Sequence, residues 1–537
     1  MEARQRWTMV AATLGSSIVF LDGTVVNIAL PKIGQELPAY NLGVLEGQTY
    51  VNTGYLAVLA ALLILGGALN DRYGRKRVFG IGLVGFGITS VLCGLAPSLD
   101  ALVLFRLLQG AAAALLVPGS LALITSTFAG PELARAFGIW AAATSAATLL
   151  GPVVGGILVQ DLTWRLAFLL NVPLIAIALF GLMRGVPETK LQGASGRFDW
   201  IGSIDVILIV GGLSFGLIRG QQNAWTDPVG WGAIVVGLLA LAAFPWLMSR
   251  RPDPLVPLSL FKSRRFTVIN IATFVIYGGL YVFLANQAIF LQGTLGYTAV
   301  AASLVGLPVG IMLTLLSARI GTYAGRLGPR RFLVAGPFLM AGALLWYARV
   351  PATSAAWRAD LAAPATFVPP ASTLIDILPA ILVFGLGISC VVAPLTSTLM
   401  SSVPVARAGL GSAINNSISR VGYPLIGAIV FIAITTVFYN QLGASVAGLD
   451  TNDPAVRAAI SPLNAAPSGS SPELVEAIRS ASADAFRLAL IVCAGLVAIG
   501  GVVDFVGLRG SGQPSQDDPE QATIAARTDS VPGSLGG

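Results

Sequence analysis

GALNDRYGRKR, residues 67–77, lies between two apolar segments, and a related stretch recurs in the second half of the chain. GTYAGRLGPRR, residues 321–331, aligns with it without gaps and keeps both glycines and several basic positions. Gly325 replaces the acidic Asp71 in the second copy. Repeated halves around a site at the membrane midplane are the architecture of secondary transporters. The repeat therefore predicts two six-helix halves, with two further helices inserted between them.

The composition predicts an all-α integral membrane protein. Of 537 residues, 55% are hydrophobic and only 11% are charged, and the mean hydropathy is +0.80. A soluble domain keeps about a quarter of its residues charged. The net charge of +7 is explained by membrane topology, so we expect no nucleic-acid partner.

Several classes of chemistry are disfavoured by what the chain lacks. Cys93, Cys390 and Cys493 all fall in apolar stretches, so we expect no disulfide framework and no metal site. The chain has no histidine, which leaves proton transfer near neutral pH to carboxylates with shifted pKa values. Without a nucleotide-binding loop, we expect no enzyme activity, no cofactor and an ion gradient as the source of energy.

A spanning helix needs about 20 mostly apolar residues, and this rule predicts fourteen spans. They lie near residues 8–30, 48–69, 78–96, 101–128, 136–159, 166–183, 200–218, 231–248, 266–291, 300–319, 332–349, 376–399, 409–438 and 485–508. With a cytoplasmic N-terminus, most Lys and Arg residues fall in cytoplasmic segments, which places both termini in the cytoplasm. We expect a multi-pass protein of the cell (inner) membrane that works as a monomer.

The spans predict a division of the chain. It consists of an N-terminal six-helix bundle (1–183), a two-helix insert with cytoplasmic linkers (184–265), a C-terminal six-helix bundle (266–508) with long outer loops (350–375 and 439–484), and a disordered cytoplasmic tail (509–537). A short helix is expected to begin at Ser471 in the second outer loop. Asp504 is expected at a span end within reach of water.

LDGTVVNIAL, residues 21–30, contains one acid, Asp22. A charge inside hydrocarbon costs at least roughly 2.5 to 3.5 kcal/mol, so it calls for an explanation. Asp22 lies about 12 Å below the outer boundary and Arg106 of the fourth span about 9 Å below it, at 1.5 Å per residue. Matched depth predicts that the two side chains pair. Pairing lowers the pKa of Asp22 and desolvation raises it, which suits a proton-coupling site; the alternative is a purely structural pair.

Four motifs, in the order expected of one family, carry a resemblance over essentially the whole chain. The segment 67–77 resembles the signature loop of the major facilitator superfamily, and LFRLLQG (104–110) is similar to its arginine motif. GPVVGG (151–156) is similar to the antiporter motif, and LDGTVVNIALP (21–31) resembles a span-1 motif of drug:proton antiporters. With fourteen spans, the chain resembles the drug:H+ antiporter-2 family of multidrug efflux transporters. The resemblance implies that Asp22 accepts protons and that Arg106 modulates it.

Two motifs predict roles in the conformational cycle. The loop after span 2 suits a state-dependent latch, although a charge run that only sets topology is the alternative. The span-5 motif suits a kink that seals the domain interface, although packing alone would also explain it. The residues are Gly67, Asp71, Arg72, Gly74 and Arg75 for the latch, and Gly151, Pro152, Gly155 and Gly156 for the kink.

Polar and aromatic residues within the spans are candidates to line a substrate cavity, with lipid-facing or packing roles as the alternative. They are Asn27, Tyr55, Gln109, Tyr277, Tyr281, Asn286, Gln287, Gln292, Asn415 and Asn416. The sequence thus predicts a proton-coupled exporter of lipophilic or cationic small molecules, with protons, a small-molecule substrate and the bilayer as partners. Because no buried acid is expected in spans 10 or 13, dicationic substrates are disfavoured. The alternatives are export of an endogenous lipid or metabolite, symport, and a membrane sensor that does not transport.

Overall fold

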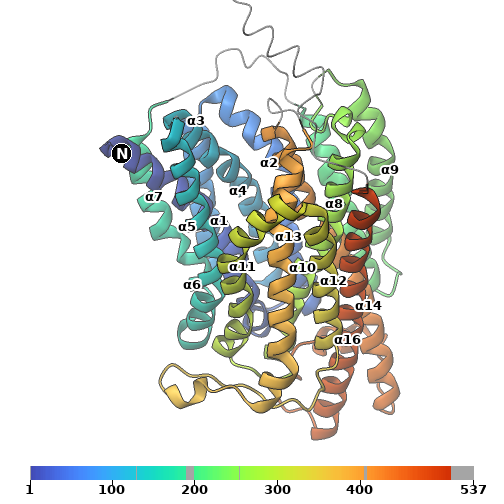
Figure 1. Ribbon diagram of the computed structural model, residues 1–537. Coiled ribbons are helices and arrows are strands. Elements are labelled where there is room, and N and C mark those ends of the chain that lie inside the picture. The colour runs from blue at the N-terminus through green and yellow to red at the C-terminus, as the bar shows by residue number, and fades with distance from the viewer. Residues whose placement is uncertain (1, 129, 189–198, 253, 404–407, 510–537) are drawn as a thin grey trace, which may run out of the picture.

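The computed structural model describes residues 2–128, 130–188, 199–252, 254–403 and 408–509 (Figure 1). Helices dominate these residues, and no β-strand occurs among them beyond an isolated bridge between Asp360 and Ala363. The first half contains α1 (Ala3–Glu36), α2 (Val44–Tyr73), α3 (Arg75–Gly94), α4 (Leu99–Thr127), α5 (Gly130–Ile157), α6 (Leu166–Leu169) and α7 (Asn171–Gly185). The insert contains α8 (Trp200–Gln222) and α9 (Pro228–Arg250). The second half contains α10 (Arg264–Gly293), α11 (Ala299–Leu327), α12 (Pro329–Tyr347), α13 (Leu378–Met400), α14 (Ala408–Ser445), α15 (Pro454–Ala459) and α16 (Pro472–Gly507).

The described helices make this a multi-pass membrane protein. Eleven of the described helical segments are long and apolar enough to cross a bilayer, with α6 and α7 together forming one of them. The long helices α2, α5 and α12 lie beside them in the bundle (Figure 1). This arrangement is consistent with the fourteen predicted spans, although the exact number stays a prediction.

The internal repeat predicted from the two loops is reproduced in the backbone. Gly74 separates α2 from α3 with φ 105°, and Gly328 separates α11 from α12 with φ 86°. Both values lie where a side chain would be strained, so glycine allows each chain reversal. The equivalent turns support the pairing of the two halves.

The bundle has two distinct ends. The chain starts and α16 finishes at one end, which we call the terminal end, at the top of Figure 1. The long connections 348–372 and 446–471 lie at the opposite end, which we call the loop end.

The halves are joined by apolar packing at the loop end. One hydrophobic cluster includes Val25, Leu30 and Leu45 of the first half together with most of the buried apolar residues of the second half. A separate cluster, which includes Phe79 and Leu123, contains first-half residues alone. The shared core therefore closes the loop end, while the other core keeps the first half rigid.

Hydrogen bonds between the halves follow the same pattern. Among the described residues, they lie toward the loop end. The amides of Gln48 and Asn464 bond to each other in both directions at 3.0 Å. Gln160 accepts from the backbone N–H of Val300 at 3.1 Å, and Gln292 donates to the carbonyl of Ile28 at 3.0 Å.

The inserted helices occupy one side of the junction. Helix α8 packs against both α2 and α14, and α9 packs on α8. Tyr50 of the first half donates to the carbonyl of Phe215 at 3.0 Å. Arg457 of the second half donates to the carbonyl of Gln221 at 3.0 Å. Helix α8 is therefore bonded to both halves near its loop end.

Two expectations about the second half are wrong. Ser471 caps a helix, accepting from the backbone N–H of Leu474 at 3.2 Å, but that helix is α16, which continues from Pro472 to Gly507 without a separate short helix. Asp504 does not reach water, because it is fully buried. Its two carboxylate oxygens have no hydrogen-bond partner among the described residues. The tail 510–537 and much of the linker before α8 lie outside the described residues.

The reciprocal amide pair predicts a shift in conformation when it is removed. Because Asn464→Leu leaves the Oε1 of Gln48 buried without a hydrogen-bond partner, while its Nε2 keeps the carbonyl of Leu30, at a cost of about 1–3 kcal/mol, we expect it to favour loop-end opening. Spin labels at the exposed positions Tyr40 and Ser468, measured by pulsed electron resonance, should show a larger population of long distances. Asn223→Leu, which removes a surface amide of the insert, serves as the control. Unchanged distances in Asn464→Leu would show that this pair does not hold the loop end closed.

Candidate functional site

Asp22 of α1 and Arg106 of α4 form an ion pair inside the first half. The Nη1 of Arg106 lies 2.5 Å from Oδ2 of Asp22, and both side chains are fully buried. Charge-assisted hydrogen bonds at such distances are the stronger kind. The depth argument from the sequence therefore brought the correct acid and base together.

Three neutral side chains complete the surroundings of Asp22. Gln109 donates to Oδ1 of Asp22 at 3.3 Å and accepts from Arg106 Nη1 at 2.7 Å. Asn171 of α7 donates to the same Oδ1 at 3.1 Å. Both amides also donate to the hydroxyl of Ser90 on α3, at 2.9 and 3.2 Å. We call Asp22, Arg106, Gln109, Asn171 and Ser90 the carboxylate network; it ties α1, α3, α4 and α7 together.

Aromatic rings and a backbone carbonyl hold the guanidinium of Arg106. Its Nε donates to the carbonyl of Val51 at 3.1 Å, and its Cζ lies 4.1 Å from the ring centroid of Tyr55 and 5.7 Å from that of Phe168. The Nη2 atom and the Tyr55 hydroxyl are buried without hydrogen-bond partners. The site thus keeps spare donors that would gain partners if the helices rearranged.

The sequence did not point to Asn171 and Ser90, and it proposed Gln109 and Tyr55 for a substrate cavity, whereas Gln109 belongs to this network and Tyr55 stacks on Arg106. All of them are buried polar residues within apolar helices. Their presence in spans was visible in the sequence. Their common location was not, because it depends on how each helix is rotated about its axis.

The glycines of the span-5 motif allow close helix contacts on two sides of α5. A Cβ at Gly151 would collide with Thr24 of α1, and one at Gly155 would lie 3.2 Å from backbone atoms of Val25. A Cβ at Gly156 would lie 2.9 Å from the carbonyl oxygen of Ala299 on α11, in the other half. Pro152 lies inside α5, which remains helical to Ile157 and then continues into a π-helical turn.

The loop between α2 and α3 contacts an acid that the sequence reasoning did not select. Glu188, just after α7, accepts from the backbone N–H groups of Lys76 and Arg77 at 3.2 and 3.1 Å. A carboxylate is favourable there because these groups lie at the positive N-terminus of α3. Arg75 donates to the carbonyl of Ala122 on α4 at 3.1 Å. The side chain of Asp71 lies outside the described residues, so its latch role stays a prediction.

The other residues of that loop motif have simpler surroundings. The guanidinium of Arg72 lies 5.9 Å from the ring of Tyr73. A Cβ at Gly67 would make ordinary contact with Pro118 of α4, at 3.5 Å.

The candidates for a substrate cavity do not form one group. Asn27 accepts from Asn52 at 2.6 Å and Gln292 bonds across the halves, so these two lie near the junction. Gln287 donates to Tyr347, and Asn415 donates to Asn270 and Thr273, so both serve packing within the second half. The remaining candidates are Tyr277 and Tyr281, which contact each other at 6.1 Å between ring centroids; Asn286, which donates to its own helix at 2.8 Å; and Asn416, which is exposed.

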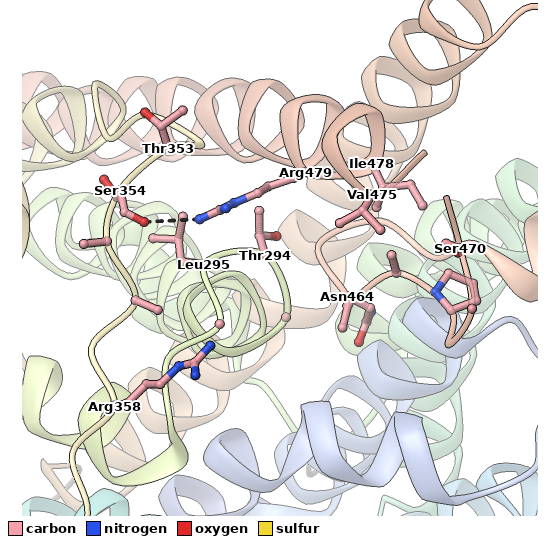
Figure 2. Close-up of a pocket in the computed structure, with 18 residues that line it drawn as sticks. Thr294, Leu295, Thr353, Ser354, Arg358, Asn464, Ser470, Val475, Ile478 and Arg479 are labelled. Atoms are coloured by element: carbon pink, nitrogen blue, oxygen red, sulfur yellow. Dashed lines mark hydrogen bonds between the residues drawn. The ribbon is translucent and has the colours of Figure 1, made fainter. Parts of the chain in front are cut away.

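A cavity in the second half lies away from the carboxylate network. It has a volume of about 600 Å³ at the loop end of the second half, between the α10–α11 turn, the 353–358 segment and the start of α16. Figure 2 shows Arg358 and Arg479 at this cavity, with Arg479 donating to the carbonyl of Ser354 at 3.2 Å. A much smaller cavity at the junction is lined by Thr49, Asn286 and Tyr423. Neither contains Asp22.

Residues 12–427 match the family model described as Major Facilitator Superfamily. The chain belongs to the Major Facilitator Superfamily. It is 33% identical over 461 residues to the puromycin resistance protein pur8 of Streptomyces alboniger, covering 84% of this chain and 85% of that protein. It is 29% identical over 540 residues to the tetracenomycin C resistance and export protein of Streptomyces glaucescens, covering 97% and 94%. The protein is therefore a membrane transporter whose relatives export or confer resistance to antibiotics, and not an enzyme.

Solved structures of the superfamily share the fold. A bacterial homologue of the human lysosomal transporter Spinster, in an inward-facing and unoccupied conformation, aligns with a TM-score of 0.60 and 18% identity, covering 95% of this chain and 98% of that one. An autoinhibited POT family peptide transporter aligns with a TM-score of 0.63 and 13% identity, covering 95% and 98%. At these identities the likeness concerns the fold alone.

The carboxylate network predicts that substitutions of Asp22 and Arg106 destabilise the folded protein by different amounts. Arg106→Met leaves Asp22 buried without its counter-ion, and breaking such a pair costs about 3–5 kcal/mol. Asp22→Asn keeps an oxygen that accepts hydrogen bonds, although it leaves Arg106 unpaired. The double variant Asp22→Asn/Arg106→Met removes both charges, so we expect it to unfold at a higher temperature than Arg106→Met alone. Thermal unfolding of the detergent-solubilised protein, followed by tryptophan fluorescence, measures the order; a double variant less stable than Arg106→Met would contradict it.

The contact between α5 and α11 predicts that bulk at Gly156 separates the halves. Gly156→Val should push α11 away and increase loop-end opening, because the facing atom is a backbone carbonyl that cannot turn aside. Gly138→Val on the same helix, where a Cβ meets nothing within 4 Å, is the matched control. The accessibility of a cysteine introduced at Ala299 to a water-soluble maleimide should rise several-fold in Gly156→Val alone. Equal labelling of both variants would argue against a seal at this position.

Proposed function

We propose that this transporter is a proton-driven exporter of lipophilic small molecules, in which Asp22 carries the coupling proton. The observation that supports this most directly is the Asp22–Arg106 pair, which is fully buried in a membrane protein without histidine. Acids inside a membrane are expensive and are commonly parts of proton relays. The printed names of the relatives, which include resistance and export proteins, favour export of drug-like compounds.

In this proposal, the terminal end faces the cytoplasm and the described conformation is the one closed toward the outside. The distribution of positive charge favours this orientation. The shared apolar core and the Gln48–Asn464 pair then form the outer seal. A lipophilic compound enters from the cytoplasmic side or the inner leaflet. In the outward-open state a proton binds to Asp22 and the compound is released.

The packing of α1 offers a route from the proton to the seal. Asp22 lies beside Thr24 and Val25, which face the glycines Gly151 and Gly155 of α5. The next residue, Gly156, lies on another side of α5 and meets α11 of the other half. Protonation removes the charge that holds Arg106, so the position of α1 relative to α4 has a different free energy with and without the proton. Two arrangements with different proton affinity are what coupling requires.

The proposal predicts loss of coupling when Asp22 cannot ionise. In everted vesicles with a pH-sensitive dye, a lipophilic drug should partly dissipate the proton gradient with the wild-type protein and not with Asp22→Asn. Asp205→Asn, which changes a buried acid of the insert (5% exposed), is the control and should behave as wild type. Gradient dissipation by Asp22→Asn at the wild-type level would disprove the mechanism. A wild-type protein that accumulates no compound in proteoliposomes would instead point to a sensor.

A further inference from the structure

Arg420 of α14 is a buried cation that the proton site does not use. Arg420 is only 9% exposed, and its Nε atom is buried without a hydrogen-bond partner. No ion pair among the described residues includes it. A cation within a membrane helix costs at least roughly 2.5 to 3.5 kcal/mol unless a partner compensates it. The second half thus presents a positive charge whose partner is not part of the described chain.

The guanidinium of Arg420 points toward the first half. Its Cζ lies 5.8 Å from the ring centroid of Phe20 on α1. Phe20 lies two residues before Asp22 on α1, so this contact places Arg420 close to the depth of Asp22 in the bundle. Asp22 is the acid of that neighbourhood, but its oxygens are already taken by Arg106, Gln109 and Asn171. Arg420 therefore faces the first half at the level of the carboxylate network without sharing its acid.

Other polar groups near this face also lack partners. Thr13 and Ser17 lie on the same side of α1 as Phe20, because residues three and four apart share a helix face. Their hydroxyls are buried without hydrogen-bond partners, and so is the hydroxyl of Ser417, three residues before Arg420. Asn416, one turn before Arg420 on α14, is exposed. The buried hydroxyls of Ser17 and Ser417 are therefore unpaired groups on the two helices that Arg420 and Phe20 bring together.

We propose that Arg420, with the hydroxyls of Ser417 and Ser17, forms a subsite for an acidic group on the transported compound. The group is a carboxylate or a phenolate, since a guanidinium binds such oxygens through paired hydrogen bonds. Phe20 supplies an aromatic surface for the rest of the molecule. The inference rests on the proposed export function and narrows its substrates to lipophilic acids and zwitterions, because the same guanidinium repels simple cations.

In the proposed subsite, the compound bridges both halves. Arg420 belongs to the second half, whereas Phe20 and Ser17 belong to the first. A ligand that touches both sides has a different set of contacts when the halves rotate, and only such differential contacts shift a conformational equilibrium. The compound's charge is recognised on one half and the proton is held on the other.

Two fluorescent probes on one scaffold test the subsite: pyrenebutyrate, which carries a carboxylate, and its uncharged methyl ester. Their binding to the full-length protein in lipid nanodiscs is measured by fluorescence anisotropy. Arg420→Gln should weaken binding of pyrenebutyrate by about 10- to 100-fold, as expected for hydrogen bonds to a charged group, and change binding of the ester less than about twofold. Arg420→Lys should recover most of the affinity. Arg358→Gln, the same change at an exposed arginine of the loop-end cavity, should leave both affinities unchanged.

A further variant keeps the test independent of folding. Ser417→Ala retains the charge, and it should weaken pyrenebutyrate alone, by about 3- to 10-fold for one hydrogen bond. The subsite is refuted if Arg420→Gln binds both probes as wild type does, if Arg358→Gln instead loses the acid, or if wild type binds the ester and not the acid. If wild type binds neither probe yet couples drug flux to protons through Asp22, the subsite alone is wrong. If wild type shows no proton-coupled flux either, the proposed function fails with it.

Discussion

The rest of the first half is arranged around one constraint, which is that Asp22 and Arg106 cannot be left without each other inside a membrane. Desolvation of two charges is repaid only when geometry and additional hydrogen bonds are favourable. Here Gln109 of α4 and Asn171 of α7 provide those bonds, and Ser90 of α3 accepts hydrogen bonds from both amides. The helices that carry them are therefore held in one register. The charge pair gives the first half its internal order.

Much of the architecture could be predicted from the sequence, because backbone geometry alone decides where the chain turns and how deep a residue lies in the bilayer. The two turns at Gly74 and Gly328 are recognisable because glycine is needed at their positive φ. The contact between Asp22 and Arg106 could be predicted because depth in a bilayer follows from the helical rise, without knowledge of helix rotation. The rotation of each helix about its own axis could not be predicted in this way. Gln287 and Asn415 face their own half, Gln109 joins the acid, and Asp504 is enclosed by its neighbours rather than wetted.

The two halves contribute unlike chemistry to the junction between them. The first half supplies an acid that is fully compensated, and the second supplies Arg420, which is not. The repeat has thus diverged in function while it kept its backbone, as the replacement of Asp71 by Gly325 also shows. Under the proposed function, an asymmetric pair of halves treats a proton and an organic ion separately, because each is recognised on a different half.

The inserted helices make the two seams of the molecule unequal. On one side, α8 packs against both α2 and α14, and its backbone carbonyls accept hydrogen bonds from Tyr50 and Arg457. On the other side, α5 meets α11 directly through Gly156, with nothing inserted between them. The α5–α11 seam is therefore formed by the two halves alone, whereas the α2–α14 seam is also covered by α8. The inserted helices thus make the two lipid-facing sides of the junction different, and a compound entering from the bilayer would meet a different set of helices on each side.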